Sequence, residues 1–525
     1  MDVIRTDLVV VGAGAAGLLA AVAARRRGLE VLVVEASGLA GGSTATGDGR
    51  LWLPANHLMG KLGIADSVEV AADYLDAVLG SPSVTSTPER RAAYAETAGK
   101  LGRWLASSKL PLVAENQTAD HDLEAPGARS GGRVVHCESF DRRVLGEWDE
   151  WLRSPEAAGR SGLRNRVIGA TLTRHASRSS GEALAGELLH RAIGTGVEIW
   201  LDSRVVDLVE SGDGIGGVVV RRNVQGSDAE VGIEVLAGRG VLLAGNGFEA
   251  NQQLREEYLP LPTDAAWSAS GSSDDGGLLA LAIEHGAATG ALDEAWWTPV
   301  LVTGGRAYPL DQARRAPHSL IVDSAGSRFF NEAGPDTDAG RALYDRSRGV
   351  RAIPSFLIMD SRHRREVPLG PWAAGAIHRS ELDTGDVMKA STLNDLAQQL
   401  GIDRAGLIGT VVQFNAFARK GVDQDYHRGE VPGARRKANA SLGKVEKSPF
   451  WAVRVYPGDL GTKGGVLVDA DGRVLRPDGS VIAGLHACGG TAASLMGRTS
   501  PGPGAALGEA LVGAFRAVLK LSEAA

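Results

Sequence analysis

Apolar runs, a helical pattern and glycine turns follow one another at the start of the chain and predict a βαβ unit. Residues 7–11 form a short apolar run that is typical of a strand buried in a parallel sheet. Residues 15–27 are rich in alanine and favour a helix, and Gly28 stands where helices commonly end. Residues 30–35 are a second apolar run. Strand, helix and strand joined by short loops indicate an α/β domain with a parallel sheet.

Apolar periodicity divides the rest of the chain into further elements. Helical patterns are expected over residues 63–107, 140–153, 181–195, 391–400 and 404–418. Strand patterns are expected near residues 198–210, 216–222, 232–236, 240–245, 319–323 and 355–360. The polar turn 223–228 suits an antiparallel hairpin. Residues 448–525 return to strands, glycine turns and a final helix.

The pattern changes between residues 298 and 445, where strand-like pieces alternate with polar loops and helices. We therefore expect one domain inserted into another. Residues 298–445 form the insertion, and residues 1–297 and 446–525 form the first domain. The basic segment 428–447 is expected to be the solvated exit of the insertion. A chain of 525 residues has room for two or three domains of roughly 100–200 residues each.

Composition excludes several classes of protein. The formal net charge of −7 disfavours a nucleic-acid partner. Two cysteines, Cys137 and Cys488, imply no disulfide framework, so a reducing compartment and hence the cytoplasm are expected. There is no run of about 18 apolar residues, so no integral membrane segment is predicted. No metal site is expected. Glycine is unusually frequent, with 70 residues, nearly twice the average share of about 7%.

The strongest chemical signal is the glycine motif inside the predicted βαβ unit. Gly12 permits the turn from strand to helix, Gly14 lets a pyrophosphate approach the backbone, and Gly17 lets the helix pack on the sheet. Unpaired N–H groups at the start of the helix favour phosphate. Glu35 ends the second strand, where its carboxylate can accept hydrogen bonds from an adenosine ribose. The expected dinucleotide contacts are Gly12, Gly14, Ala15, Ala16, Gly17, Glu35 and Ala36.

A second glycine run follows the second strand, and two more glycine turns follow later apolar strands. Small and hydroxyl residues at these places suit the close passage of a flavin, which a nicotinamide enzyme does not need. The alternatives are a plain surface loop for the run and structural turns for the other two. The run offers Gly41, Gly42, Ser43, Thr44, Thr46, Gly47, Asp48 and Gly49. The two turns offer Ala244, Gly245, Asn246, Gly247 and Gly489.

With these motifs, the chain resembles the 3-ketosteroid dehydrogenases within the fumarate reductase/succinate dehydrogenase flavoprotein superfamily. The resemblance covers nearly the whole chain and rests on segments 41–56, 123–133, 241–249, 293–297, 328–335, 458–489 and 500–511. It implies non-covalent FAD, a Rossmann-like FAD-binding domain in two sequence pieces, and an inserted α+β catalytic (cap) domain. It also implies FAD contacts at Val206, Asp275, Gly504, Ala505 and Leu507.

The resemblance further implies the reaction. In that family, a hydride leaves one ring carbon of a cyclic ketone for flavin N5, while a base takes a proton from the neighbouring carbon, alpha to the carbonyl. A hydroxyl and a backbone N–H polarise the carbonyl oxygen. The expected substrate is a 3-ketosteroid-like or smaller alicyclic ketone, and an unknown acceptor takes up the electrons.

The chain departs from the family at the places where the family usually carries tyrosines or an aromatic pair. Asp336, Ser500 and the dipeptide His121-Asp122 stand at these places. Gly504, whose N–H would face the substrate carbonyl in the family, is kept. The chain therefore matches the family in its scaffold but lacks the family's catalytic tyrosines.

Each replacement has a chemical and a structural interpretation. Asp336 could be the base, because desolvation in a flavin cavity raises a carboxyl pKa, or it could be a turn or helix N-cap residue. His121, with an ordinary pKa near about 6.5, could accept or relay a proton, or it could lie in a solvated loop. Ser500 could hydrogen-bond a carbonyl or serve as a turn hydroxyl. The catalytic candidates are Asp336, Ser500, Gly504, His121 and Asp122.

Three functions stay open at this point. The leading one is an FAD-dependent dehydrogenase that introduces a carbon–carbon double bond beside a ring carbonyl. An ene-reductase of fumarate reductase type would catalyse the reverse reaction. Such enzymes usually use clustered arginines to hold a carboxylate and donate a proton, and no clear cluster stands out. A flavin-binding protein with altered catalysis is the third, and the missing tyrosines motivate it. Tyr308, Tyr344 and Tyr456 could also take over the tyrosine role.

Overall fold

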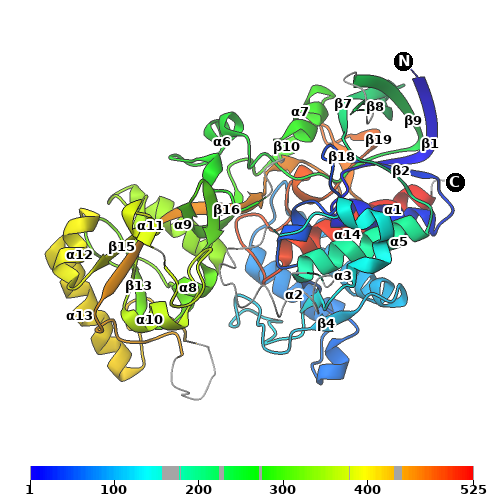
Figure 1. Ribbon diagram of the computed structural model, residues 1–525. Helices are drawn as coiled ribbons and strands as arrows, with labels where there is room; N and C mark the ends of the chain where they lie inside the picture. The colour runs from blue at the N-terminus through cyan, green and yellow to red at the C-terminus, as the bar shows by residue number, and fades with distance from the viewer. Residues whose placement is uncertain are drawn as a thin grey trace. The chain divides into compact units, whose positions relative to one another are not determined.

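The computed structural model describes residues 2–155, 177, 179–223, 230–270, 275–377, 379–430 and 440–523. The chain folds into two compact units (Figure 1). Unit 1 comprises Met1–Phe248, Gly271–Glu294 and Thr462–Ala525, and unit 2 comprises Glu249–Ser270 and Ala295–Gly461. Each unit is built from segments that are distant in the sequence.

An eight-stranded sheet forms the centre of unit 1. Its path runs β18-β19-β9-β1-β2-β6, and β8 pairs with both β9 and β7. The neighbouring pairs from β19 to β6 are all parallel, as the predicted βαβ unit requires. The strands are β1 (Asp2–Val11), β2 (Val31–Val34), β6 (Glu198–Trp200), β7 (Ser203–Ser211), β8 (Gly214–Asn223), β9 (Glu230–Leu243), β18 (Arg473–Leu475) and β19 (Val481–Ala487).

Strand β9 corrects one expectation and confirms another. The two strands predicted near 232–236 and 240–245 are one continuous strand, because β1 pairs with β9 along both parts across a register shift. The antiparallel pairing of β8 with β9 confirms the predicted hairpin, although residues 224–229 of its turn lie outside the described part of the chain.

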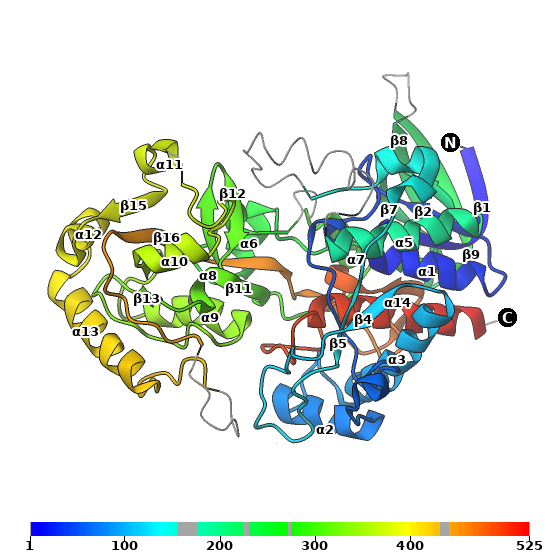
Figure 2. The same cartoon turned by 60° about the horizontal axis from the view of Figure 1, so that its bottom comes forward.

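Helices α1, α5 and α14 pack side by side along one face of this sheet (Figure 2). The predicted helix 140–153 is instead a 3₁₀ segment, broken at Gly146, whose φ of 59° and ψ of −127° are not helical. Within the described residues, no helix combines the length and apolarity needed to cross a membrane. The helices of unit 1 are α1 (Ala15–Arg25), α2 (Val68–Leu79), α3 (Pro88–Ser107), α5 (Ser180–Gly194), α7 (Gly277–Glu284) and α14 (Ala505–Glu523), with 3₁₀ turns η1 (Ser43–Thr46), η2 (Met59–Leu62), η3 (Arg142–Trp151) and η5 (Gly489–Thr491).

Two small sheets complete unit 1. One has the order β3-β5-β4 and the other pairs β10 with β17. Their strands are β3 (Leu51–Trp52), β4 (Leu112–Ala114), β5 (Val134–Cys137), β10 (Thr289–Gly290) and β17 (Gly465–Val466).

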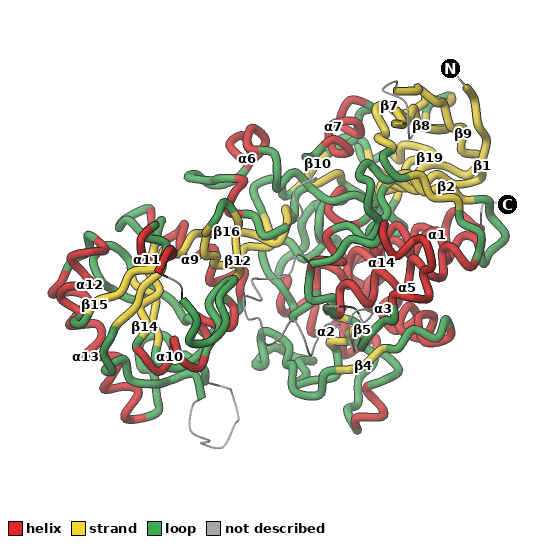
Figure 3. Tube along the Cα trace, viewed as in Figure 1, coloured by secondary structure: helices red, strands yellow, loops and turns green. Residues whose placement is uncertain are grey.

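Unit 2 contains a six-stranded sheet with helices packed on both of its faces (Figure 3). Leu320, Phe356 and Ala452 point into a core with α12 and α13, whereas the alternate residues Ile321 and Leu357 point into a second core with α9. The strands are β11 (Ala295–Thr303), β12 (Arg306–Pro309), β13 (Ser319–Val322), β14 (Ser355–Met359), β15 (Val387–Ala390) and β16 (Phe450–Thr462). The helices are α6 (Gln252–Tyr258), α8 (Asp311–Arg315), α9 (Asp336–Ser347), α10 (Ser361–Glu366), α11 (Arg379–Asp383), α12 (Leu393–Leu400) and α13 (Arg404–Lys420), with the 3₁₀ turn η4 (Ala265–Trp267).

The boundaries of unit 2 differ from those of the predicted insertion, residues 298–445. Residues 249–270 and 446–461 also belong to unit 2, because β16 pairs with β14 and β15 in its sheet. Which unit binds the cofactor stays a prediction at this point. The prediction that segment 428–447 is solvated is wrong at its first residue. Arg428 is fully buried and donates to the carbonyls of Ser319 and Ala316.

His486 on β19 makes stability depend on pH. Its ring is 5% exposed, and neither ring nitrogen has a hydrogen-bond partner among the described residues. Burial lowers its pKa to about 4, so between about pH 6.5 and 4 the unfolded chain binds a proton that the folded chain does not. The free energy of unfolding should therefore fall by up to about 1.4 kcal/mol per pH unit as the pH decreases through this window.

Urea denaturation followed by circular dichroism between pH 4.5 and 7 measures this slope. His486→Leu should raise the unfolding midpoint and make the slope shallower. Some slope should persist, because burial also lowers the pKa of His363 in unit 2 to about 4. An equally steep slope in the variant would contradict the assignment to His486.

Candidate functional site

The parallel strands of unit 1 end at a common edge of the sheet. Val11 is in register with Val34 and with Leu243, and Leu243 is in register with Ala487. The carboxyl ends of these strands lie together, and ligands of open α/β sheets bind at such an edge. The residues that follow the four strand ends are Gly12, Glu35, Ala244 and Cys488.

The glycine turns that the sequence singled out meet at this edge. A Cβ on Gly12 would lie 2.7 Å from the Ala244 carbonyl oxygen, and a Cβ on Gly42 would lie 3.0 Å from the Gly14 Cα. The Gly41 N–H donates to the Ala13 carbonyl at 2.8 Å. Segments 12–14, 41–42 and 244–245 therefore approach so closely that side chains at their contact points would collide.

Side chains and a further turn join the same cluster of loops. The Asn246 amide donates to Ser43 Oγ at 3.0 Å. A Cβ on Gly489 would lie 3.3 Å from the Gly245 carbonyl oxygen, and a Cβ on Gly490 would lie 2.7 Å from the Gly247 nitrogen. The structure thus brings together four loops that the sequence analysis selected separately.

The start of α1 has the properties of a pyrophosphate site. Gly14 is the N-cap residue and offers no side-chain cap, and the first turn carries no acidic side chain. The first N–H groups of a helix have no partner inside the helix and bind anions. No atom lies within 4 Å of the position that a Cβ would take on Gly14. These features fit the phosphate groups of FAD.

Glu35 lies where the sequence analysis expected a ribose-binding carboxylate, and it has a second task. Its carboxylate accepts the Ala13 N–H at 2.8 Å, the Ser37 N–H at 2.9 Å and the Ser37 hydroxyl at 2.8 Å. Ala36 beside it is exposed. Because a carboxylate can accept about four hydrogen bonds, these bonds leave capacity for a ribose hydroxyl. Glu35 also ties the glycine turn to the end of β2.

The rest of the second glycine run packs on a helix. A Cβ on Gly49 would lie 2.4 Å from the Gly181 nitrogen, and a Cβ on Gly181 would lie 2.1 Å from the Thr44 carbonyl oxygen. Thr46, Gly47 and Asp48 are exposed. Packing against α5 therefore explains Gly49 without a ligand.

Val206 and Asp275 lie in unit 1, and the strand that carries Val206, β7, begins beside Glu35. The Ser203 N–H at the start of β7 donates to the Glu35 carbonyl oxygen at 2.9 Å, and Val206 follows on the same strand. Asp275 pairs with Arg204 of β7 at 2.9 Å. Their contact with FAD stays a prediction.

The predicted site residues near the end of the chain surround the start of α14. Gly504 has a φ of +83°, and a Cβ there would lie 2.7 Å from the Arg50 carbonyl oxygen, so the backbone requires glycine. Ala505 begins the helix and is buried, and Leu507 is half-buried. The first turn of α14 carries no acidic side chain, as in α1.

His121 and Ser500, which are 379 residues apart in the sequence, lie side by side. His121 Nδ1 is 2.9 Å from the Ser500 carbonyl oxygen. The His121 N–H donates to the Pro501 carbonyl at 3.0 Å. Ser500 Oγ donates to the Gly502 carbonyl at 3.3 Å, which fits the turn interpretation of this hydroxyl. The structure thus joins two of the catalytic candidates in unit 1.

Asp122 and Asp336 have structural contacts. The Asp122 carboxylate accepts the N–H groups of Glu124 and Ala125, as a turn residue does. Asp336 begins α9 in unit 2 and pairs with the buried Arg314 and with Arg315. A carboxylate held by two guanidinium groups is a poor base, because proton uptake would weaken both pairs.

Sequence reasoning missed the residues that surround His121. Tyr74 of α2 is fully buried and donates its hydroxyl to the Pro501 carbonyl at 2.6 Å. Asp120 accepts from Trp52 Nε1 and from Arg133, each at 2.8 Å. Burial raises the pKa of Asp120, and Arg133 opposes this shift. Tyr74 shows in the sequence only as one apolar position on the buried stripe of α2, so no signal linked it to residue 501.

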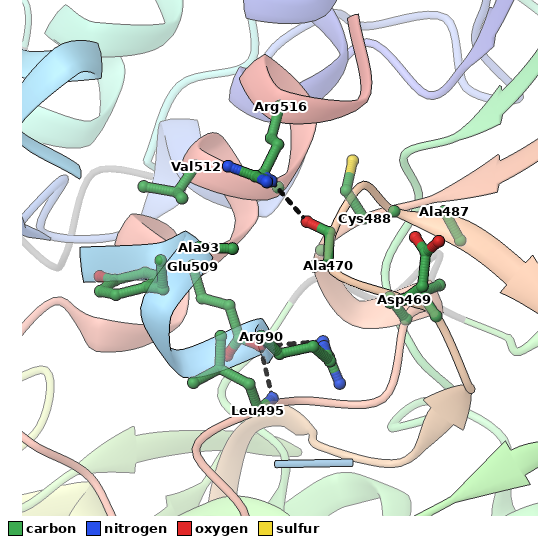
Figure 4. A pocket seen from close by; sticks show the side chains of 16 residues that line it. Arg90, Ala93, Asp469, Ala470, Ala487, Cys488, Leu495, Glu509, Val512 and Arg516 are labelled. Atoms are coloured by element: carbon green, nitrogen blue, oxygen red, sulfur yellow. Dashed lines mark hydrogen bonds and ion pairs between the residues drawn. The ribbon is translucent and has the colours of Figure 1, made fainter. Parts of the chain in front are cut away.

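One partly open cavity of unit 1 lies behind the turn that contains Cys488 and Gly489. It lies between α3, α14 and the turns around residues 470 and 488, and its volume is about 50 Å³ (Figure 4). Arg90, Glu509 and Arg516 line it, and the Glu509 carboxylate accepts the Leu495 N–H at 2.6 Å. Sites for drug-sized ligands measure roughly 300–1,000 Å³, so this cavity suits water rather than a cofactor or a cyclic ketone.

A parallel sheet, glycine turns at its carboxyl edge and an uncapped helix start define a dinucleotide-binding protein. Residues 7–507 match the family of FAD binding domains. The whole chain is 35% identical to the whole of the 3-oxosteroid 1-dehydrogenase of Mycobacterium tuberculosis. It is 32% identical to the 4-oxocyclohexanecarboxylate 2-dehydrogenase of Sinomonas cyclohexanicum, over 96% of this chain and 90% of that protein.

Solved structures agree. The 3-ketosteroid delta1-dehydrogenase of Sterolibacterium denitrificans, in complex with 1,4-androstadiene-3,17-dione, superimposes with a TM-score of 0.89 at 33% identity, over 99% of this chain and 100% of that one. A flavocytochrome c3 fumarate reductase shares the fold, with a TM-score of 0.68 at 21% identity. The chain belongs to the 3-ketosteroid dehydrogenase-like family of FAD-binding flavoproteins, and it is an FAD-dependent oxidoreductase.

Two glycine variants separate folding from FAD binding. Gly17→Ala should prevent stable folding of unit 1, because its Cβ would lie 1.9 Å from the Gly12 carbonyl oxygen. Gly14→Ala should fold, since its φ of −72° suits alanine and no protein atom is near. It should weaken FAD binding by about 1–3 kcal/mol, or about 5- to 150-fold, by crowding the pyrophosphate.

Equilibrium titration of the apoprotein with FAD measures the affinity, and circular dichroism measures folding. Gly194→Ala at the end of α5 is a suitable control, because a Cβ there meets no atom within 4 Å. Gly28→Ala is not suitable, because Gly28 has a φ of +84°, which strains alanine. Wild-type FAD affinity in Gly14→Ala would contradict the placement of the pyrophosphate at the start of α1.

Proposed function

We propose that this chain is an FAD-dependent dehydrogenase that introduces a carbon–carbon double bond alpha,beta to the carbonyl of a cyclic ketone. Two full-length relatives carry names of dehydrogenases that act on such ketones, one on 3-oxosteroids and one on 4-oxocyclohexanecarboxylate. The observation that supports the proposal most is the 2.9 Å contact between His121 and Ser500 in unit 1. In the proposed role, this imidazole would accept a proton beside the segment that leads to Gly504.

In this proposal, unit 1 is a Rossmann-like FAD-binding domain and unit 2 is the inserted α+β catalytic (cap) domain. The start of α1 would hold the pyrophosphate of non-covalently bound FAD, and Glu35 would hold the ribose. When bound, FAD supplies the acceptor for the hydride that leaves the beta carbon. The loops around Gly42 and Gly245 would line the approach of the ring system, and the first turn of α14, which carries no acidic side chain, would present a second set of helix N–H groups.

His121 would take the alpha proton. As the C–H bond breaks, its electrons delocalise toward the carbonyl oxygen, and the proton forms an N–H bond on the imidazole. The Gly504 N–H would stabilise the charge that develops on that oxygen, and Ser500 Oγ would add a second donor by turning away from the Gly502 carbonyl. The two arginines paired with Asp336 favour its structural role over the role of base.

The substrate proposed is an alicyclic or steroid-like ketone that is more polar than the family's usual one. Histidine, aspartate and serine at positions 121, 122 and 500 replace aromatic side chains, so the site loses apolar surface and gains hydrogen-bonding groups. A polar ring ketone of the size of 4-oxocyclohexanecarboxylate fits this chemistry. Turnover would require an external electron acceptor.

Anaerobic mixing of the purified holoenzyme with candidate ketones tests the function directly. A substrate should bleach the visible band of oxidised flavin, and the product should carry one new double bond by mass spectrometry. The panel should contain 3-ketosteroids and alicyclic ketones with and without a carboxylate. If no ketone bleaches the flavin while an enoate rapidly reoxidises the reduced enzyme, the protein is an ene-reductase instead.

Two variants separate the candidate bases. His121→Gln should slow flavin reduction by about 10²- to 10⁴-fold, the usual contribution of a positioned acid–base group. Asp336→Asn should leave the rate within a few-fold of wild type. It should lower stability by about 1–3 kcal/mol, because it weakens charge-assisted bonds to Arg314 and Arg315 at a partly exposed site.

Stopped-flow absorbance gives the rates and urea denaturation gives the stabilities. The reverse ranking of the two variants would make Asp336 the base. If flavin reduction in neither variant differed from wild type, the altered flavin-binding protein would become the better description.

A further inference from the structure

The segment 497–504, which carries Ser500 and Gly504, has its carbonyl groups held one after another by residues outside it. Buried Lys463 donates Nζ to the carbonyls of Gly497 and Thr499, at 2.9 and 2.6 Å. The Trp52 N–H donates to the Gly504 carbonyl at 3.0 Å. Between these anchors, the carbonyls of Ser500 and Pro501 are held by His121 and Tyr74.

Tyr74 fixes the middle of the segment. Its hydroxyl donates to the Pro501 carbonyl at 2.6 Å and accepts the Asp122 N–H at 3.3 Å. It therefore contacts the peptide after Ser500 and the residue after His121 at the same time. Moving this buried tyrosine is costly, because the Pro501 carbonyl would keep only the bond from the His121 backbone N–H and the Tyr74 hydroxyl would lose both of its partners.

The contact between His121 and Ser500 decides where the imidazole carries its proton. A backbone carbonyl oxygen can only accept a hydrogen bond. His121 Nδ1 lies 2.9 Å from such an oxygen and must therefore be the donor. In a neutral imidazole one nitrogen donates and the other accepts, so Nε2 bears the lone pair.

We propose that Tyr74 is a positioning residue for His121: by holding Pro501, it keeps the Ser500 carbonyl against Nδ1, so that Nε2 is the proton acceptor in ketone oxidation. This inference rests on the proposed function and names the atom that performs its proton transfer. When Nε2 takes the alpha proton, an Nε2–H bond forms and the ring becomes an imidazolium. The Nδ1–H bond to Ser500 then becomes charge-assisted and stabilises the ion.

The charged groups around Tyr74 are Asp120, Asp122 and Arg133, and Arg133 also pairs with Asp66 at 2.8 Å. Asp120 and Arg133 pair at 2.8 Å, and Asp122 is an exposed turn residue. Burial keeps the pKa of the Tyr74 phenol well above its usual range, so this hydroxyl stays a donor across the working pH range. Arg498 of the segment pairs with Glu294.

Tyr94 provides a matched control. It is also buried, it also flanks Trp52, and its hydroxyl also donates to a backbone carbonyl at 2.6 Å, but that carbonyl belongs to Trp52. Tyr74→Phe and Tyr94→Phe each remove a buried hydroxyl that flanks Trp52 and donates to a backbone carbonyl. Only the first loses the bonds to Pro501 and to the Asp122 N–H.

The test measures the pH dependence of kcat/KM with a ketone that reduces the wild-type flavin. Tyr74→Phe should lower kcat/KM about tenfold or more, since the base loses its orientation. It should also move the acidic limb to lower pH by on the order of 0.5–1 unit, because a looser Nδ1–H bond stabilises the imidazolium less. Tyr94→Phe should keep the wild-type limb, and His121→Gln should lose it. A Tyr74→Phe enzyme with wild-type kcat/KM and an unmoved limb would overturn the proposal.

A second measurement needs no substrate. Nitrogen-15 spectra of histidine-labelled holoenzyme distinguish the two neutral tautomers, and the signal missing in His121→Gln assigns residue 121. The wild type should show the Nδ1–H tautomer, and Tyr74→Phe should show a mixture. An Nε2–H tautomer in the wild type would overturn the inference whether or not a ketone substrate is found. Absence of any ketone oxidation would instead refute the proposed function.

Discussion

Close approach of bare backbone at the carboxyl edge of one sheet is the constraint on which the site of this protein depends. Strands β1 and β9 end side by side, with Val11 in register with Leu243. A Cβ on Gly12, which follows β1, would lie 2.7 Å from the carbonyl oxygen of Ala244, which follows β9. Helix α1 begins against the same turn, with Gly17 over the Gly12 carbonyl. Only residues without a Cβ permit this contact, and it is the contact that leaves helix N–H groups available to an anion.

The catalytic candidates depend on a different kind of contact. Tyr74 and Pro501 are 427 residues apart, and His121 and Ser500 are 379 residues apart, yet each pair is joined by one short hydrogen bond. Such bonds contribute modestly to stability, but losing one leaves a buried polar group unpaired at a cost of about 1–3 kcal/mol. Their main effect is therefore to fix geometry, which is what proton transfer requires.

Asp336 shows why a motif position does not define a role. The sequence places this carboxylate where the family carries a tyrosine, and a raised pKa in a cavity would have made it a base. In unit 2 the same carboxylate begins α9 and pairs with Arg314 and Arg315. Nothing in the sequence around residues 314–315 indicates this pairing, because it joins the end of α8 to the start of α9, about 20 residues further along the chain.

The sequence by itself determined the βαβ unit, the glycine turns, Glu35 and the membership of a flavoprotein family, because these depend on local periodicity and on residues that tolerate unusual backbone. It also pointed to His121 and Ser500 as substitutions at the reacting end, and to Gly504 as a residue kept there. Tertiary structure alone decided that β9 is one strand, that β16 belongs to unit 2, and that Tyr74 holds the segment carrying Ser500. Hydrogen bonds across hundreds of residues leave no periodic signal in a single sequence, so only the folded chain reveals them.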